Sequence, residues 1–171
     1  MLPLLALTVA QRAAVGDIAI ESSGIESALN WMIGYLLHLK QDECLLLLGT
    51  RMLDSKLDLL KELCLRKLTT EEDKQSLRDK IGLLKGLNKD RTVAIHGIWQ
   101  RKGGPTSLAD LMRLEALPIQ EMVAVHEKSG RELPASELEN LAKRLEAANM
   151  DLLNFFIWVF AEALTGKPRG A

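Results

Sequence analysis

Arg91 and His96 are residue types that can do chemistry together, and they stand five positions apart in the segment RTVAIHGIWQ. Histidine exchanges a proton near neutral pH, whereas arginine stays charged and offers a planar fork of donors that matches phosphate oxygens. The pair suits attack of an RNA 2′-hydroxyl on its own phosphate. His96 would move protons, and Arg91 would neutralise the charge that grows on the phosphoryl oxygens. This chemistry requires no metal ion.

The elements around the pair decide whether its two side chains can meet. In a continuous helix, side chains five residues apart point in directions that differ by about 140°. They converge more easily if Arg91 stands at a helix start, and the segment 88–90 is a candidate kink or restart, with Asp90 as the cap. In the alternative interpretation the segment is structural: Arg91 caps or pairs, while His96 and Trp99 pack between helices.

A local basic patch accompanies the pair. The whole chain has a formal net charge of −1, from 22 basic and 23 acidic residues, so it has no overall attraction to nucleic acid. Between Lys85 and Lys102, however, five basic residues stand against one acidic residue. On the His96 face of a helix the recurring positions are Lys85, Lys89, Thr92, Trp99 and Gln100. We therefore expect RNA-binding side chains at Lys85, Lys89, Arg101 and Lys102.

The sequence contains no motif typical of a phosphate, dinucleotide or metal site. There is no glycine-rich phosphate loop, no dinucleotide fingerprint, and no pair of His or Cys residues at metal-ligand spacing, so we expect neither a metal nor a cofactor. Cys44 and Cys64 lie in apolar periodic segments, typical of buried thiols in a reducing cytosol. The apolar start lacks a preceding positive charge, and the run Leu152–Phe160 is too short to span a membrane, which favours a cytoplasmic protein.

The composition and length favour one mainly α domain. Of the 171 residues 47% are apolar and 26% charged, which excludes a disordered chain, and the 4% of aromatic residues disfavours a stacking platform for single-stranded nucleic acid. Apolar residues recur every three or four positions, which predicts a bundle of four to five main helices. We expect a single domain over 1–171, with a helical extension over 1–20 that breaks near Gly16, and a loose tail over 166–171.

Several local patterns refine this expectation. A short helix is predicted over 41–48, ending at Gly49, and Thr69 with Glu72 forms a candidate capping box for the next long helix. Residues 105–133 predict a small β or irregular insertion, with a strand near 121–127 and a turn at 128–131. The last helix carries a heptad seam and becomes apolar all round near 155–160, typical of a bundle centre or a subunit interface. The predicted buried stripes are Leu53, Leu57, Leu60 and Cys64; Leu77, Ile81, Leu84 and Leu87; and Leu138, Leu141, Leu145, Ala148, Leu152, Phe155 and Val159.

The segment Arg91–Trp99 resembles the Arg-x(4–6)-His motif of the HEPN superfamily, whose members are all-α proteins and often ribonucleases. It is similar in particular to bacterial HEPN-like proteins with the pattern Arg-Asn-x-x-x-His-Gly-x-Trp. The resemblance implies an antiparallel helical bundle that forms a homodimer and brings two Arg/His pairs into one cleft, with Arg91 and His96 catalytic. At the position after the arginine, where the family usually carries Asn, Asp or His, this chain has Thr92.

The resemblance implies a metal-independent endoribonuclease of the toxin or phage-defence kind, with a cognate antitoxin or other partner protein. Some HEPN domains are non-catalytic, so the alternative is a helical module that binds RNA, nucleotide or a protein. Thr92 and Trp99 would support the site. Gly97 would allow another helix or the partner chain to approach closely. Glu26 is either a positioning carboxylate in the same cleft or part of a solvated helix face.

Overall fold

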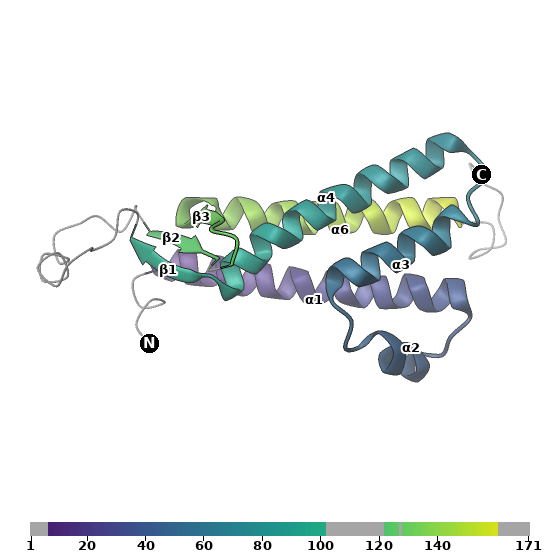
Figure 1. Ribbon diagram of the computed structural model, residues 1–171, viewed down its shortest axis with the longest axis horizontal. Coiled ribbons are helices and arrows are strands. Elements are labelled where there is room, and N and C mark those ends of the chain that lie inside the picture. Colours follow the sequence, from purple (N-terminus) through teal and green to yellow (C-terminus); the bar gives the residue numbers. More distant parts are fainter. Residues whose placement is uncertain (1–6, 102–121, 127, 161–171) are drawn as a thin grey trace, which may run out of the picture. The chain divides into compact units, whose positions relative to one another are not determined.

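The computed structural model describes residues 7–101, 122–126 and 128–160, and of residues 98–101 it describes the backbone (Figure 1). The predicted mainly α class is confirmed. The elements are α1 (Val9–Leu37), α2 (Gln41–Leu48), α3 (Leu53–Leu65), α4 (Glu71–His96), β1 (Ile98–Arg101), β2 (Met122–Val125), β3 (Glu132–Pro134), the 3₁₀ turn η4 (Ala135–Glu137) and α6 (Leu138–Val159).

The chain forms two compact units. The smaller unit comprises 1–20 and 89–143, and the larger comprises 21–88 and 144–171. In the larger unit, parts of α1, α3, α4 and α6 contact one another in a closed ring. Each neighbouring pair of helices is joined by a side-chain contact: Glu26 with Lys56, Asp58 with Lys85, Lys80 with Asp151, and Trp31 with Phe156.

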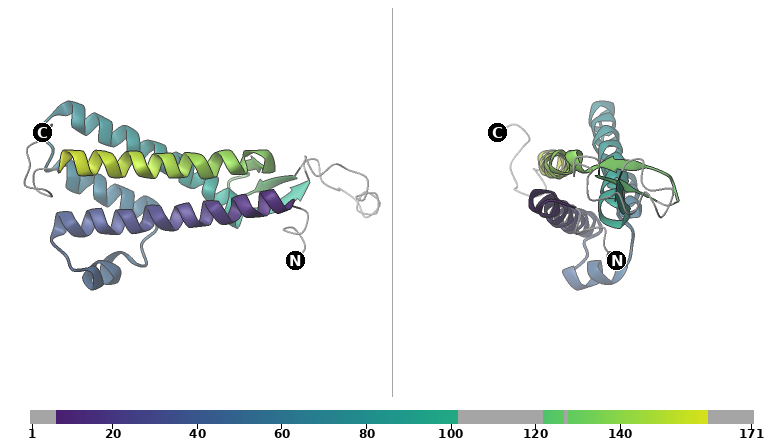
Figure 2. Two further views of the ribbon diagram at one scale, coloured as in Figure 1. Left: turned by 180° about the vertical axis from the view of Figure 1, so that it is seen from behind. Right: turned by 90° about the vertical axis from the view of Figure 1, so that its left-hand side faces the viewer.

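The helix directions in the larger unit are mixed. Along α4, Lys85 pairs with Asp58 and Asn88 with Asp54, so α3 and α4 run antiparallel, as predicted. Along α1, by contrast, the built Cβ position of Gly24 lies 3.7 Å from Asn149, and Trp31 contacts Phe156. The contact of Trp31 with Phe156 lies further along both helices than the contact of Gly24 with Asn149. α1 and α6 therefore run parallel, and they lie side by side in Figure 2.

The predicted stripes form the core. All predicted core positions of α3 and α4 are buried, because their three- and four-residue spacing keeps them on one helix face. Along α6 the seam departs from prediction at one place: Phe156 is buried, whereas Phe155 is only half-buried. A straight helix drifts from a strict heptad, which moves the buried position one residue onward.

Two predicted helix features are wrong, and a third is narrowed. α1 is one helix of 29 residues that runs through Gly16, so the chain does not break there. Near the start of α4, the Thr70 hydroxyl accepts a hydrogen bond from the Asp73 N–H at 3.1 Å, so Thr70 rather than Thr69 caps the helix. The end of α6 is not buried all round within one chain, since Ile157 and Trp158 are 41% and 51% exposed, so it is not the bundle centre, and its role as a subunit interface stays a prediction.

The smaller unit contains an antiparallel sheet with the strand order β1-β2-β3. The predicted strand and turn near 121–131 are confirmed as β2 and the turn into β3. Here Gly130 has a φ of +63°, and its N–H donates to the His126 carbonyl at 2.8 Å. β1 lies where the sequence spacing predicted more helix. Residues 105–121 of the predicted insertion lie outside the described residues.

Candidate functional site

The Arg91–His96 motif occupies the last two turns of α4, within the smaller unit. α4 is continuous from Glu71 to His96, so the kink or restart predicted at 88–90 is absent. Arg91 is half-buried and His96, the last residue of the helix, is exposed. Because the helix continues through both, their side chains leave it in directions about 140° apart. Within one chain, the helix itself therefore does not bring the Arg91 and His96 side chains together.

Asp90 has a tertiary role rather than the predicted capping role. The Arg131 Nε donates to Asp90 Oδ1 at 2.8 Å, and a second guanidinium nitrogen contacts the same carboxylate oxygen. This ion pair joins the end of α4 to the residue that precedes β3. Sequence reasoning missed it, because a pair separated by 41 positions has no periodic signature.

Gly97 ends α4 and lets β2 approach. Its N–H donates to the Val93 carbonyl at 2.8 Å, closing the last helical turn. A Cβ at this position would lie 3.2 Å from the Ala124 Cβ and 3.3 Å from the Val125 carbonyl oxygen. The predicted close approach is therefore made by a strand of the same chain. The sheet packs tightly against the end of the motif helix.

The structure describes only some residues of the predicted basic patch. Lys85 binds Asp58 Oδ1 at 2.7 Å, and this hydrogen bond is the main cause that lowers the pKa of Asp58 below its usual value. Lys89 is exposed and Thr92 is half-buried. The side chain of Arg101, and Lys102 altogether, lie outside the described residues.

Trp99 is not at a helical position. It lies in β1, where it is paired with Ala124, so the helical spacing that grouped Trp99 and Gln100 with His96 does not apply. Its side chain lies outside the described residues. A strand following the Gly97 bend was not predicted, because the segment 98–101 is too short to display an alternating pattern.

Glu26 belongs to the larger unit, where it neutralises a buried lysine. The Lys56 Nζ donates to Glu26 Oε2 at 3.1 Å, with the side chains of Lys56 and Glu26 1% and 38% exposed. Neither sequence interpretation of Glu26 anticipated this contact. The apolar pattern around Lys56 gave no sign that its charge would be buried.

The described part of the chain contains neither a cluster of metal ligands nor a helix suited to spanning a membrane. Among residues 7–101, 122–126 and 128–160, no group of three or more His, Cys, Asp or Glu side chains is placed to hold a metal ion. Within the same ranges, no helix combines the length and apolarity needed to cross a membrane. Comparison of the chain with models of protein families, with curated proteins and with solved structures gave no match.

Proposed function

We propose that this chain is a HEPN-like, metal-independent endoribonuclease whose active unit is a homodimer in the cytoplasm. The observation that carries the proposal is the exposure of His96 at the last residue of α4, five positions after Arg91 in an Arg-x4-His-Gly-x-Trp sequence. An exposed imidazole at a helix end is accessible to a polymer such as RNA.

The reaction would be an intramolecular transesterification. The RNA 2′-oxygen attacks the adjacent phosphorus, and the bond from phosphorus to the 5′-oxygen of the next nucleotide breaks. His96 moves the proton between the attacking and leaving oxygens, and Arg91 stabilises the charge on the phosphoryl oxygens. The products carry a 2′,3′-cyclic phosphate and a free 5′-hydroxyl.

Two chains are part of this proposal because one continuous helix directs Arg91 and His96 apart. A site that takes Arg91 from one chain and His96 from its partner does not require the two side chains to converge along α4. A toxin or phage-defence role, with a cognate antitoxin or other partner protein, is the biological setting that we propose for such an activity.

A second candidate is a non-catalytic HEPN-like module that binds RNA, nucleotide or a protein. Two observations favour it. Thr92 stands where the motif usually carries Asn, Asp or His, and Asp90 beside Arg91 is engaged in a structural ion pair with Arg131. In this alternative the motif helix serves to hold the sheet.

The two candidates separate in a cleavage assay with EDTA present. The chain and its His96→Ala and Arg91→Ala variants are incubated with a panel of RNAs, and product ends are analysed for cyclic phosphate. A matched control is His38→Asn, which changes an exposed histidine at φ 57°, a conformation that asparagine tolerates. The proposal predicts cleavage by the wild type and the control alone. RNA binding without cleavage by any of the four proteins would favour the second candidate.

A further inference from the structure

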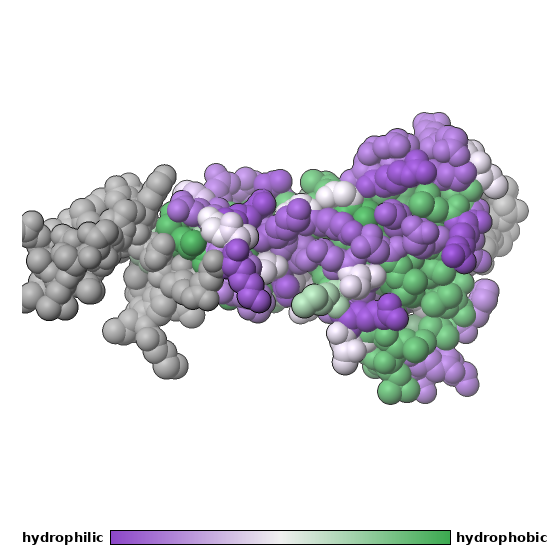
Figure 3. Space-filling view, in the orientation of Figure 1, coloured by the Kyte–Doolittle hydropathy of each residue, from purple (hydrophilic) through white to green (hydrophobic). Residues whose placement is uncertain are grey.

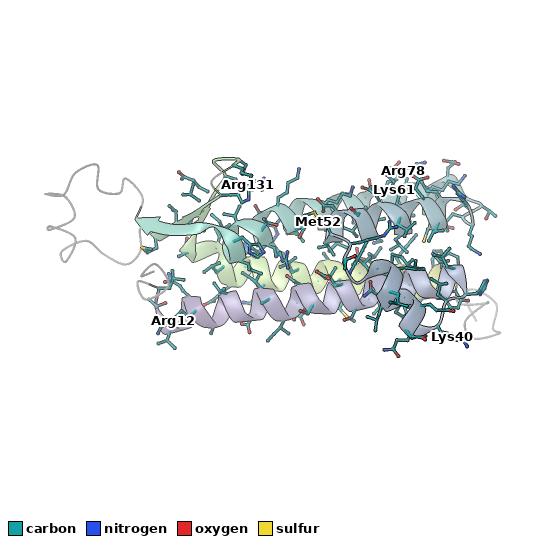
Figure 4. All side chains as sticks on the ribbon, turned by 60° about the horizontal axis from the view of Figure 1, so that its bottom comes forward. Arg12, Lys40, Met52, Lys61, Arg78 and Arg131 are labelled. Atoms are coloured by element: carbon teal, nitrogen blue, oxygen red, sulfur yellow. The ribbon has the colours of Figure 1, made fainter. Side chains whose placement is uncertain are left out.

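α2 presents a row of exposed leucines in the larger unit. Leu45, Leu46 and Leu47 are 57%, 83% and 53% exposed, and Met52, just before α3, is 80% exposed. We call these four residues the α2 surface. Figure 3 shows hydrophobic side chains over this part of the molecule, and Figure 4 labels Lys40 and Met52 on either side of the α2 segment. Contiguous exposed apolar side chains of this kind mark interaction sites.

The opposite face of α2 is fixed to the core. Cys44 and Leu48 are buried, at 5% and 2% exposure. Gly34 of α1 permits this seating, because a Cβ there would collide with the Cys44 Sγ. The helix is therefore held with Leu46 outward, and the exposure of the leucines follows from how α2 packs.

A groove beside α2 extends the apolar area. A cavity of about 530 Å³ lies between α1 and α2, and its lining includes Trp31, Tyr35 and Leu45. Trp31 is itself 45% exposed. Leu45 belongs both to the groove and to the α2 surface, so a partner seated on the leucines would also cover the mouth of the groove.

The charges at the two ends of α2 indicate which partner fits. Asp42 and Glu43 are in its first turn, and Arg51 follows its end, with its Nε donating to the Leu47 carbonyl at 3.2 Å. The Lys40 N–H donates to Glu43 Oε2 at 2.7 Å, so Glu43 is engaged within its own chain and the carboxylate that we assign to the partner contact is that of Asp42. A second α2 packed antiparallel would place Asp42 opposite Arg51 at both ends. Antiparallel packing also aligns the helix dipoles favourably.

We infer that the α2 surface is a self-association surface, on which the α2 of a second copy packs antiparallel about a two-fold axis. The leucines of the two copies cover each other, and Asp42 of each chain faces Arg51 of the other. The inference is independent of RNA cleavage, because it uses only residues of the larger unit. Its test measures association and its outcome does not depend on enzymatic activity.

The first test is sedimentation velocity over a range of concentrations around the micromolar. The wild type should show a monomer–dimer equilibrium, and Leu46→Lys should weaken it on the order of tenfold or more, from the lost burial of one leucine in each of the two copies. The matched control is Leu83→Lys, which changes a leucine of α4 that is 48% exposed. Circular dichroism of each variant reports its helicity. A wild type that stays monomeric, or equal weakening by the two substitutions, would overturn the inference.

Charge reversal tests the antiparallel geometry. Asp42→Lys alone and Arg51→Glu alone should each weaken the dimer, because like charges then face each other at both ends. Mixing the two variants should restore association, since both ends of the heterodimer then pair opposite charges. Local unfolding of α2 would not be cured by mixing. Failure of the mixture to associate, or association of the wild type with anionic vesicles in place of a second copy, would contradict the inference.

Discussion

The buried Lys56 ammonium and the partly exposed Glu26 carboxylate should respond very differently to mutation. Glu26→Gln leaves a positive charge that is 1% exposed without its counter-ion, whereas Lys56→Met leaves a carboxylate that is 38% exposed and open to water. Removing one partner of a buried pair costs far more when the remaining charge cannot be hydrated. We therefore predict that Glu26→Gln destabilises the protein more than Lys56→Met.

The magnitudes follow from the geometry of the pair. At 3.1 Å and an effective dielectric constant of about 20, the gross attraction is about 5 kcal/mol. Glutamine retains a carbonyl acceptor for the Lys56 ammonium, so we expect Glu26→Gln to cost about 3 kcal/mol, at the lower end for a broken buried pair. Lys56→Met keeps the length and apolar volume of the side chain, and should change stability by less than about 1 kcal/mol.

Urea denaturation at neutral pH, followed by circular dichroism, measures both changes. Glu26→Gln should also lower the melting temperature by about 6–12 °C for a chain of this length. The double variant should recover most of the loss, because it removes the buried charge as well. A cost for Lys56→Met equal to or larger than that for Glu26→Gln would refute the reasoning.

Three further predictions concern other contacts. Gly97→Val should destabilise the smaller unit by about 1–3 kcal/mol, because a Cβ there collides with the Val93 carbonyl oxygen and crowds Ala124. Hydrogen exchange of the β2 amides should accelerate, and unchanged exchange would count against this packing. Lys85 lowers the pKa of Asp58, so the contribution of Asp58 to stability is present above the usual pKa of 3.8 and is lost as the pH falls through the lowered pKa. Asp58→Asn should therefore flatten the acid limb of the curve of stability against pH. An unchanged acid limb would contradict the pairing of Asp58 with Lys85. Burial raises the pKa of the Cys64 thiol to about 12, so this thiol should react with a thiol reagent at pH 8 only after unfolding, and fast labelling of the native protein would show that it is not buried.

Local sequence patterns were sufficient to predict most of the helices. The spacing in α3 and α4 identified their buried faces, because a helix with one apolar stripe has one way to face a core. The end of α2 at Leu48 was predicted for a similarly local reason, the glycine that follows it. The kink at 88–90 was wrong because polar residues that favour a helix start also tolerate a helix interior when a tertiary partner is present. Asn88 has such a partner in Asp54, to which its amide donates at 3.0 Å.

The features that the sequence did not reveal depend on contacts between distant positions. The pairs of Arg131 with Asp90 and of Lys56 with Glu26 join residues 41 and 30 positions apart. β1 depends on pairing with β2, which lies within the predicted insertion and is distant from β1 in the sequence. The same holds for the candidate site. The spacing identified the Arg-x4-His motif, but the directions of the Arg91 and His96 side chains depend on whether the helix continues between them.

The central claim, an Arg/His site shared by two chains, is tested most directly by complementation. Arg91→Ala and His96→Ala chains are mixed, allowed to exchange subunits, and assayed for RNA cleavage in EDTA. Each variant alone should be inactive, and the mixture should recover about a quarter of wild-type activity, because half of the dimers are mixed and each has one complete site. An inactive mixture beside an active wild type would contradict a site shared by two chains. An inactive wild type would contradict the proposed ribonuclease activity.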